Sequence, residues 1–218
     1  MKHTLVLFIV CLAAMSTAVG KTNAKKPPKP TIPWKNCGST GDAIDPATKA
    51  LNPHKNRIDS PKATDIDKKI TLAAMLKPGG DSTRFTKSVA AEITGFVYDV
   101  KVGGVETCNC HYADTVHQDT HIELVPTESD TSSKKKVIVE ITPRMRKALG
   151  KMVDWSTPTL QKTILHKWIK VKGWVLYDSE HALESWNIDP TNKLGRKNWR
   201  ATVWEVHPIT SLEVVTHP

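Results

Sequence analysis

Five stretches of this chain alternate apolar and polar residues as β-strands do, and their order constrains the fold more than any other feature. The stretches span residues 88–101, 119–126, 135–144, 168–178 and 201–214. A polar segment with helical character separates the third from the fourth. In it, Ser156 or Thr157 can cap a short helix that has Pro158 at its first position.

Three strands, a helix and two strands follow one another in the order of an OB-fold, a partly open Greek-key barrel. We therefore expect a mainly β protein, with a five-stranded OB-fold-like barrel over residues 88–215 and one short helix between strands three and four. Gly173 lies in the middle of the fourth strand, where a small barrel coils sharply. In the fifth strand, Glu205 and His207 share one face and Trp204 lies on the other.

The N-terminal part divides into three segments. Residues 1–20 have a cationic start, a short apolar run and small residues at the end, as a Sec signal peptide does, so we expect export to the periplasm or the medium. Residues 21–35 are basic and rich in proline, which predicts an extended linker. Residues 36–87 predict an irregular arm with one short helix over 66–75. No apolar run is long enough for a confident membrane span, so we do not expect an integral membrane protein.

Removal of the leader takes Cys11 away and leaves Cys37, Cys108 and Cys110. In an oxidising compartment three cysteines form at most one internal disulfide. A bond between Cys108 and Cys110 would close a small, strained ring. We therefore predict a disulfide from Cys37 to either Cys108 or Cys110, which would fasten the arm to the barrel.

Thiols and imidazoles gather in the string CNCHYADTVHQDTH, and such groups bind zinc or copper. The spacing matches no strong zinc signature, so we expect no cofactor and keep zinc or copper as the alternative. The candidate metal ligands are Cys108, Cys110, His111, His121, His181 and His207.

A second candidate site depends on how the strands pair. His121 on the second strand and Glu205 and His207 on the fifth are candidate catalytic residues, because histidines with one carboxylate can hold a metal and leave a position for water. The alternative is that Glu205 and His207 form structural hydrogen bonds at the mouth of the barrel.

Tryptophan is unusually frequent, with seven residues against three phenylalanines and three tyrosines. Tryptophans near arginines can stack on bases or sugars and bind anions, although packing in the core is the alternative. The candidate ligand-binding residues are Trp174, Trp199, Trp204, Arg144, Arg146 and Arg200.

The strings CNCHYAD, DTHIEL, VIVEITPR, VKGWVLYDSEH and NWRATVWEVHPITSLEV occur in this order. Together they resemble a family of uncharacterised exported bacterial proteins with an OB-like domain. The resemblance covers about residues 88–215 and implies the fold and export, but it supplies no activity and no functional residues.

Two functions follow as expectations. The first is an exported OB-fold binding protein without catalysis, whose ligand is an oligosaccharide, a nucleic acid or another anionic polymer. A net charge of +9 agrees with such a partner. The alternative is a metal-dependent hydrolase of the phosphodiesterase or nuclease type, with His121, Glu205 and His207 at the barrel face. The chain lacks a Gly-rich phosphate loop, an H-E-x-x-H string and a G-x-S-x-G string.

Overall fold

The computed structural model describes residues 36–86, 88–150 and 153–216. The expected signal peptide and linker, residues 1–35, lie outside the described residues. Among the residues that are described, no helix is long and apolar enough to cross a membrane.

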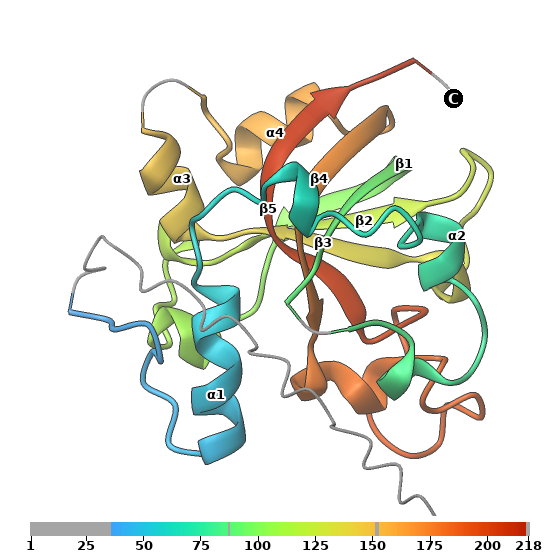
Figure 1. Cartoon of the computed structure of the whole chain (residues 1–218), viewed down its shortest axis with the longest axis horizontal. Helices are drawn as coiled ribbons and strands as arrows, with labels where there is room; N and C mark the ends of the chain where they lie inside the picture. The colour runs from blue at the N-terminus through green and yellow to red at the C-terminus, as the bar shows by residue number, and fades with distance from the viewer. Residues whose placement is uncertain (1–35, 87, 151–152, 217–218) are drawn as a thin grey trace, which may run out of the picture.

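Five strands form a closed barrel, which confirms the predicted OB-like fold (Figure 1). They are β1 (Ala90–Val102), β2 (Thr120–Val125), β3 (Val137–Ile141), β4 (Trp168–Tyr177) and β5 (Trp204–Val214). Their order around the barrel is β1, β2, β3, β5, β4, and β4 pairs again with β1. The β3–β5 pair is parallel and the other pairs are antiparallel.

Two positions let the strands close into so small a barrel. β1 pairs with β4 through its first half and with β2 through its second half, and its register with β2 shifts between Val97 and Asp99. Gly173 lies where β4 crosses β5 closely. A Cβ atom at Gly173 would lie 2.3 Å from the carbonyl oxygen of Pro208, so only glycine fits there.

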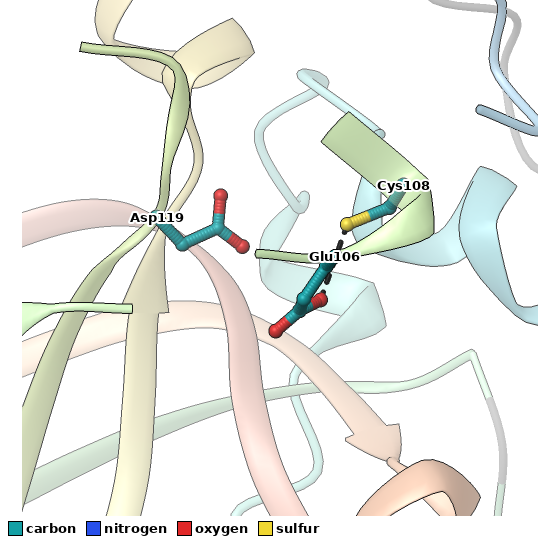
Figure 2. Close-up of side chains that lie close together, drawn as sticks. All are labelled: Glu106, Cys108 and Asp119. Carbon is teal, nitrogen blue, oxygen red and sulfur yellow. Dashed lines mark hydrogen bonds between the residues drawn. The ribbon is translucent and has the colours of Figure 1, made fainter. Parts of the chain in front are cut away.

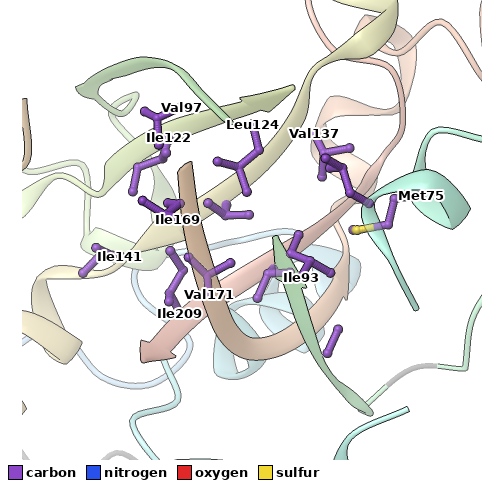
Figure 3. Packing of buried hydrophobic residues seen from close by; sticks show 14 of the residues in the cluster. Met75, Ile93, Val97, Ile122, Leu124, Val137, Ile141, Ile169, Val171 and Ile209 are labelled. Carbon is purple, nitrogen blue, oxygen red and sulfur yellow. The ribbon is translucent and has the colours of Figure 1, made fainter. Parts of the chain in front are cut away.

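The barrel interior is filled with aliphatic side chains (Figure 3). Ile122, Val139 and Val206 belong to this core, and each is fully buried. Two helices add to it. α4 (Thr157–Thr163) contributes its Leu160, and α2 (Leu72–Met75) contributes its Met75. A five-stranded barrel filled in this way is a packed core, so we look for a functional site on its outer face.

The connection between β3 and β4 contains two helices rather than the one predicted. α4 has Ser156 as its N-cap and Pro158 in its first turn, as expected. The additional helix, α3 (Pro143–Leu149), begins directly after β3 because the Thr142 side chain accepts a hydrogen bond from the Met145 amide.

The N-terminal arm also differs from the prediction. α1 (Pro46–Lys55) was not predicted, although Asp45 caps it and Pro46 starts it. Its buried residues are Asn52 and Lys55, so it lacks the apolar stripe by which helices are usually found. The predicted helix over 66–75 is reduced to α2, since Ile66 instead forms a bridge to Ala90.

Candidate metal centre

Ionisable side chains gather on the outer face of β2, β3 and β5. His121 on β2 is the cross-strand partner of Glu140 on β3, and β5 brings Glu205 and His207 beside them. Side chains alternate along a strand, so these residues point away from the apolar core. They are nevertheless buried, with exposed fractions of 6% or less. The cover consists of α1 and of the loops that follow β1 and β4 (Figure 1).

His207 lies at the centre of this group. Its Nδ1 atom is 3.2 Å from Glu205 Oε1 and 3.3 Å from Glu140 Oε2, and its Nε2 atom is 3.4 Å from Asp119 Oδ2. Asp119 directly precedes β2 and is 1% exposed. One imidazole therefore faces three carboxylates inside the protein.

Arg200 neutralises one of these carboxylates. Its guanidinium is fully buried, with Nη2 2.9 Å from Glu205 Oε2, and it also donates to the carbonyl oxygens of Thr202 and Val203. Glu205 is thus held between Arg200 and His207. In the described part of the chain, no Lys or Arg lies within ion-pair distance of Asp119 or Glu140, and both share His207 as their basic neighbour.

The pKa values reflect this imbalance. Burial raises the pKa of Asp119 to about 7 against the lowering effect of His207, and burial raises the pKa of Glu140 to about 7 in the same way. Burial disfavours the charged form of His207. The hydrogen bond with Glu205 and the carboxylates of Glu140 and Asp119 nevertheless raise its pKa to about 9. Without a metal ion, His207 is therefore an imidazolium that faces Asp119 and Glu140.

Ligand atoms of Asp119, Glu140 and His207 lie within 4.8 Å of one another. Asp119 Oδ2 and His207 Nε2 are buried and have no hydrogen-bond partner among the described residues. Buried polar atoms without partners are uncommon in native proteins. Two carboxylates and an imidazole suit a divalent cation such as zinc or manganese, which would satisfy these atoms.

His121 supports this group from β2. Its Nδ1 atom is 2.8 Å from Glu140 Oε1, and its buried Nε2 atom has no hydrogen-bond partner in the described part of the chain. Burial and the neighbouring Lys101 lower the pKa of His121 to about 3, so its imidazole is neutral at pH 7. A neutral imidazole that donates Nδ1–H to a carboxylate keeps a free lone pair on Nε2.

A second charged group adjoins the first. Lys55, at the end of α1, is fully buried, and its ammonium nitrogen is 2.9 Å from Glu106, 2.9 Å from Asp178 and 3.1 Å from Glu180. Burial disfavours the charge on Lys55, but Asp178 and Glu106 raise its pKa well above the ordinary lysine value. Glu106 also accepts a hydrogen bond from the Cys108 thiol, whose pKa is raised well above its usual range by burial and by Glu106.

A cavity of about 380 Å³ opens beside the first group. Its wall includes Glu106, His121, Glu140, His181 and Trp199. The half-buried Trp199 donates its indole N–H to Glu184, and its ring lies 5.3 Å from the His121 ring. A small ligand in this cavity would therefore meet Glu140, which is also a candidate metal ligand.

The remaining predicted metal ligands lie apart from this centre. Cys110 forms a disulfide with Cys37, which confirms the predicted bond and removes Cys110 as a ligand. His111 is exposed and pairs with Asp42. His181 reaches the cavity, but its Nδ1 atom pairs with Glu184 and it belongs to neither donor group.

Most of the predicted ligand-binding tryptophans pack inside the fold. Trp174 is 6% exposed, lies under the Arg57 guanidinium at 3.2 Å and donates to the carbonyl oxygen of Asp59. Trp204 is fully buried and donates to the carbonyl oxygen of Asp81. Neither ring is available to a ligand on the barrel surface, and only Trp199 among the three lines the cavity.

The predicted arginines are likewise occupied. Arg144 is 3% exposed and donates to Asn56 and to the carbonyl oxygens of Cys37 and Gly38. Arg146 donates to four oxygens, which belong to the loop before β2, to the first residue of β2 and to the end of β3. Together with the buried Arg200, they hold loops in place, so these three side chains do not form the anion-binding surface expected from the sequence.

Sequence reasoning missed Asp119, Glu140, Glu106 and Lys55 as site residues. Glu140 carried a usable signal, because it interrupts the apolar run VIVEI of β3. Lys55 carried none, since it lies in a helix that has no apolar pattern. Comparison of the sequence with models of known families and with curated proteins finds no match.

Proposed function

We propose that this protein is a metal-dependent hydrolase whose cation binds to Asp119, Glu140 and His207. The observation that carries the proposal is the convergence of these three buried donors, of which Glu140 lies on the wall of a cavity. Among the described residues, Asp119 Oδ2 and His207 Nε2 have no hydrogen-bond partner. A structural metal site is usually closed by four protein ligands, whereas a catalytic site keeps a position open. Three donors beside a cavity fit the second kind.

The substrate class that we propose is a phosphodiester or a similar anionic ester. Lys101 and Arg196 lie on the cavity wall, where they can attract an anion, and Trp199 offers an aromatic surface to its substituent. A divalent cation lowers the pKa of bound water. A cation held by Asp119, Glu140 and His207 would activate water for attack on phosphorus. The bond from phosphorus to the ester oxygen would break, and the leaving alkoxide would take up a proton from solvent.

The simpler binding hypothesis remains a prediction, but it has lost its main support. Trp174, Trp204, Arg144 and Arg200, on which it depended, are buried in contacts within the fold. Of the six residues on which it depended, Trp199 lines the cavity beside the charged group. For this reason we prefer the hydrolase.

Export is also part of the proposal. The Cys37–Cys110 disulfide supports it, because such bonds persist in oxidising compartments. Cleavage after Gly20 is the expected processing step, and mass spectrometry of the mature protein would detect it. An N-terminus that retains residues 1–20 after secretion would contradict this part of the proposal.

The test of the hydrolase combines metal analysis with activity. Protein purified without chelator should contain zinc or manganese in stoichiometric amount, and it should hydrolyse a chromogenic phosphodiester. Glu140→Gln removes one ligand charge at nearly constant volume, so it should abolish the activity and remove the equivalent of metal that binds to Asp119, Glu140 and His207. Glu213→Gln, an exposed substitution on β5, is the control. Wild-type protein that binds no divalent cation and remains inactive after metal addition would refute the proposal.

A further inference from the structure

We propose that Glu106, Cys108 and Asp119 form a second cation site, which prefers thiol-binding metals and shares Asp119 with the first site. This inference rests on the proposed function, because Asp119 belongs to both donor sets. Ligand atoms of Glu106, Cys108 and Asp119 lie within 4.8 Å of one another. The loaded protein would then hold two ions linked by one carboxylate, an arrangement that recurs in two-metal hydrolases.

The surroundings of Cys108 are the first observation. The thiol is 1% exposed, and it lies outside the two clusters of packed apolar side chains. Its Sγ atom is 3.2 Å from Glu106 Oε2, and Figure 2 shows the Asp119 carboxylate pointing toward the same space. A buried free cysteine usually packs as a small apolar side chain. A thiol between two carboxylates is instead suited to a metal ion.

The Asp119 carboxylate is the second, independent observation. Its Oδ1 atom accepts a hydrogen bond from Asn109 Nδ2 at 3.0 Å. Its Oδ2 atom is buried and has no hydrogen-bond partner among the described residues, and its ion-pair neighbour is His207 Nε2 at 3.4 Å. This carboxylate lies 3.4 Å from His207 Nε2, and an oxygen of it lies within 4.8 Å of Cys108 Sγ. It is therefore placed to serve two ions.

The loop that carries Cys108 is fixed before any ion binds. The carbonyl oxygen of Cys108 accepts hydrogen bonds from Asn56 Nδ2 and from Arg144 Nη2. Two residues later, Cys110 is bonded to Cys37. A donor held in this way loses little conformational freedom on binding a metal.

Glu106 sets the expected order of binding. Its Oε2 atom is 2.9 Å from the Lys55 ammonium, so part of its charge is already compensated. The second site thus offers less free negative charge than the first, and we expect it to fill second. A thiolate with two carboxylates favours zinc, cobalt or cadmium over magnesium. Binding transfers the thiol proton to the buffer.

Cobalt provides the test, since a thiolate–Co²⁺ bond gives a charge-transfer absorption band in the near ultraviolet. The full chain with Cys11→Ser is used, so that Cys108 is the single cysteine outside the Cys37–Cys110 bond. We expect two equivalents of Co²⁺ to bind, with the band developing at the second equivalent. Cys108→Ser should lose the band and one equivalent. Cys108→Ala is the companion variant, and thermal unfolding verifies that both fold.

The two proposals fail in different ways. The Glu140→Gln variant should bind one equivalent of Co²⁺ instead of two. It should keep the charge-transfer band, which would now appear with the first equivalent of Co²⁺. The second site would be overturned if the wild type bound one or two equivalents of Co²⁺ without the charge-transfer band. It would also be overturned if the band survived in Cys108→Ser. A band in wild type together with an unchanged stoichiometry in Glu140→Gln would overturn the first site instead. No cobalt binding at all would overturn both.

Discussion

Replacing Asp178 by asparagine removes the most deeply buried of the three carboxylates around the Lys55 ammonium. Asp178 is 2% exposed, whereas the side chains of Glu106 and Glu180 are 16% and 32% exposed. Asparagine has nearly the same volume. Its side-chain oxygen can still accept the hydrogen bond from the Glu180 amide, which caps the turn over Ser179–Glu184. The substitution therefore changes charge while preserving the local fold.

The expected loss of stability is about 3 kcal/mol at pH 7. Breaking a buried ion pair costs roughly 3–5 kcal/mol because a buried charge is left without compensation. Lys55 keeps two carboxylates in the variant, so the effect should fall at the lower end. Burial works against the charge on Asp178, but Lys55 holds its pKa well below the ordinary aspartate value. In the unfolded chain the pKa of an aspartate is about 4. The stabilising effect of Asp178 is therefore complete above about pH 4, and it is lost as the pH falls from there towards the lower pKa of the folded state.

Urea unfolding followed by tryptophan fluorescence measures this difference, at several pH values from neutral to acidic. The free energy of unfolding should fall in Asp178→Asn at pH 7 with an unchanged m value. The gap to wild type should narrow in acid. Glu213→Gln breaks the exposed pair with Lys170, whose atoms are 3.1 Å apart, and should leave the stability unchanged. An effect of Asp178→Asn no larger than that of Glu213→Gln, or a gap that widens in acid, would refute the reasoning.

Four further expectations follow from the same contacts. Zinc at 100 times the Kd of the first site should raise the free energy of unfolding of the wild type by about 2.7 kcal/mol. The free energy of unfolding of Glu140→Gln should rise far less, and urea titrations with and without zinc measure both changes. Asp119→Asn should stabilise the metal-free protein and weaken zinc binding; a loss of stability would contradict the charge imbalance inferred here. Reduction of Cys37–Cys110, which closes a loop across 73 residues, should cost about 2–5 kcal/mol in the same assay. Gly173→Ala would place a Cβ atom 2.3 Å from a backbone oxygen of β5 and should cost about 1–3 kcal/mol, visible as a lower Tm.

The strands could be predicted because the signal that specifies them is local. Alternation along residues 201–214 placed Glu205 and His207 on one face and Trp204 on the other, and the structure has Trp204 in the core and the other two outside it. A bond between Cys108 and Cys110 would close a small, strained ring, and this argument alone left Cys108 and Cys110 as the two possible partners of Cys37. The final choice of Cys110 depends on the path of the loop after β1, which no local pattern records.

The tryptophans and arginines show the opposite case. Their number suggested a binding surface, but composition does not distinguish a ring that stacks on a ligand from one that packs against Arg57, as Trp174 does. The metal donors were hidden for another reason. Asp119 precedes β2, Glu140 lies on β3 and His207 lies on β5. His207 meets the other two because β3 pairs in parallel with β5 across a long connection. Such a contact is a property of the topology.

The position of the charged groups itself argues for a function. The barrel interior is full of aliphatic side chains, so ionisable groups on β2, β3 and β5 can only face outward, where water would normally solvate them. Here α1 and two loops cover them, and the Cys37–Cys110 bond fastens the cover. Six carboxylates then lie with three cations, namely Glu106, Asp119, Glu140, Asp178, Glu180 and Glu205 with Lys55, Arg200 and His207. Apolar residues of similar size would usually stabilise such a site more than buried charges do. A fold that encloses uncompensated carboxylates beside a cavity is therefore better explained by a cation that binds there than by the needs of stability.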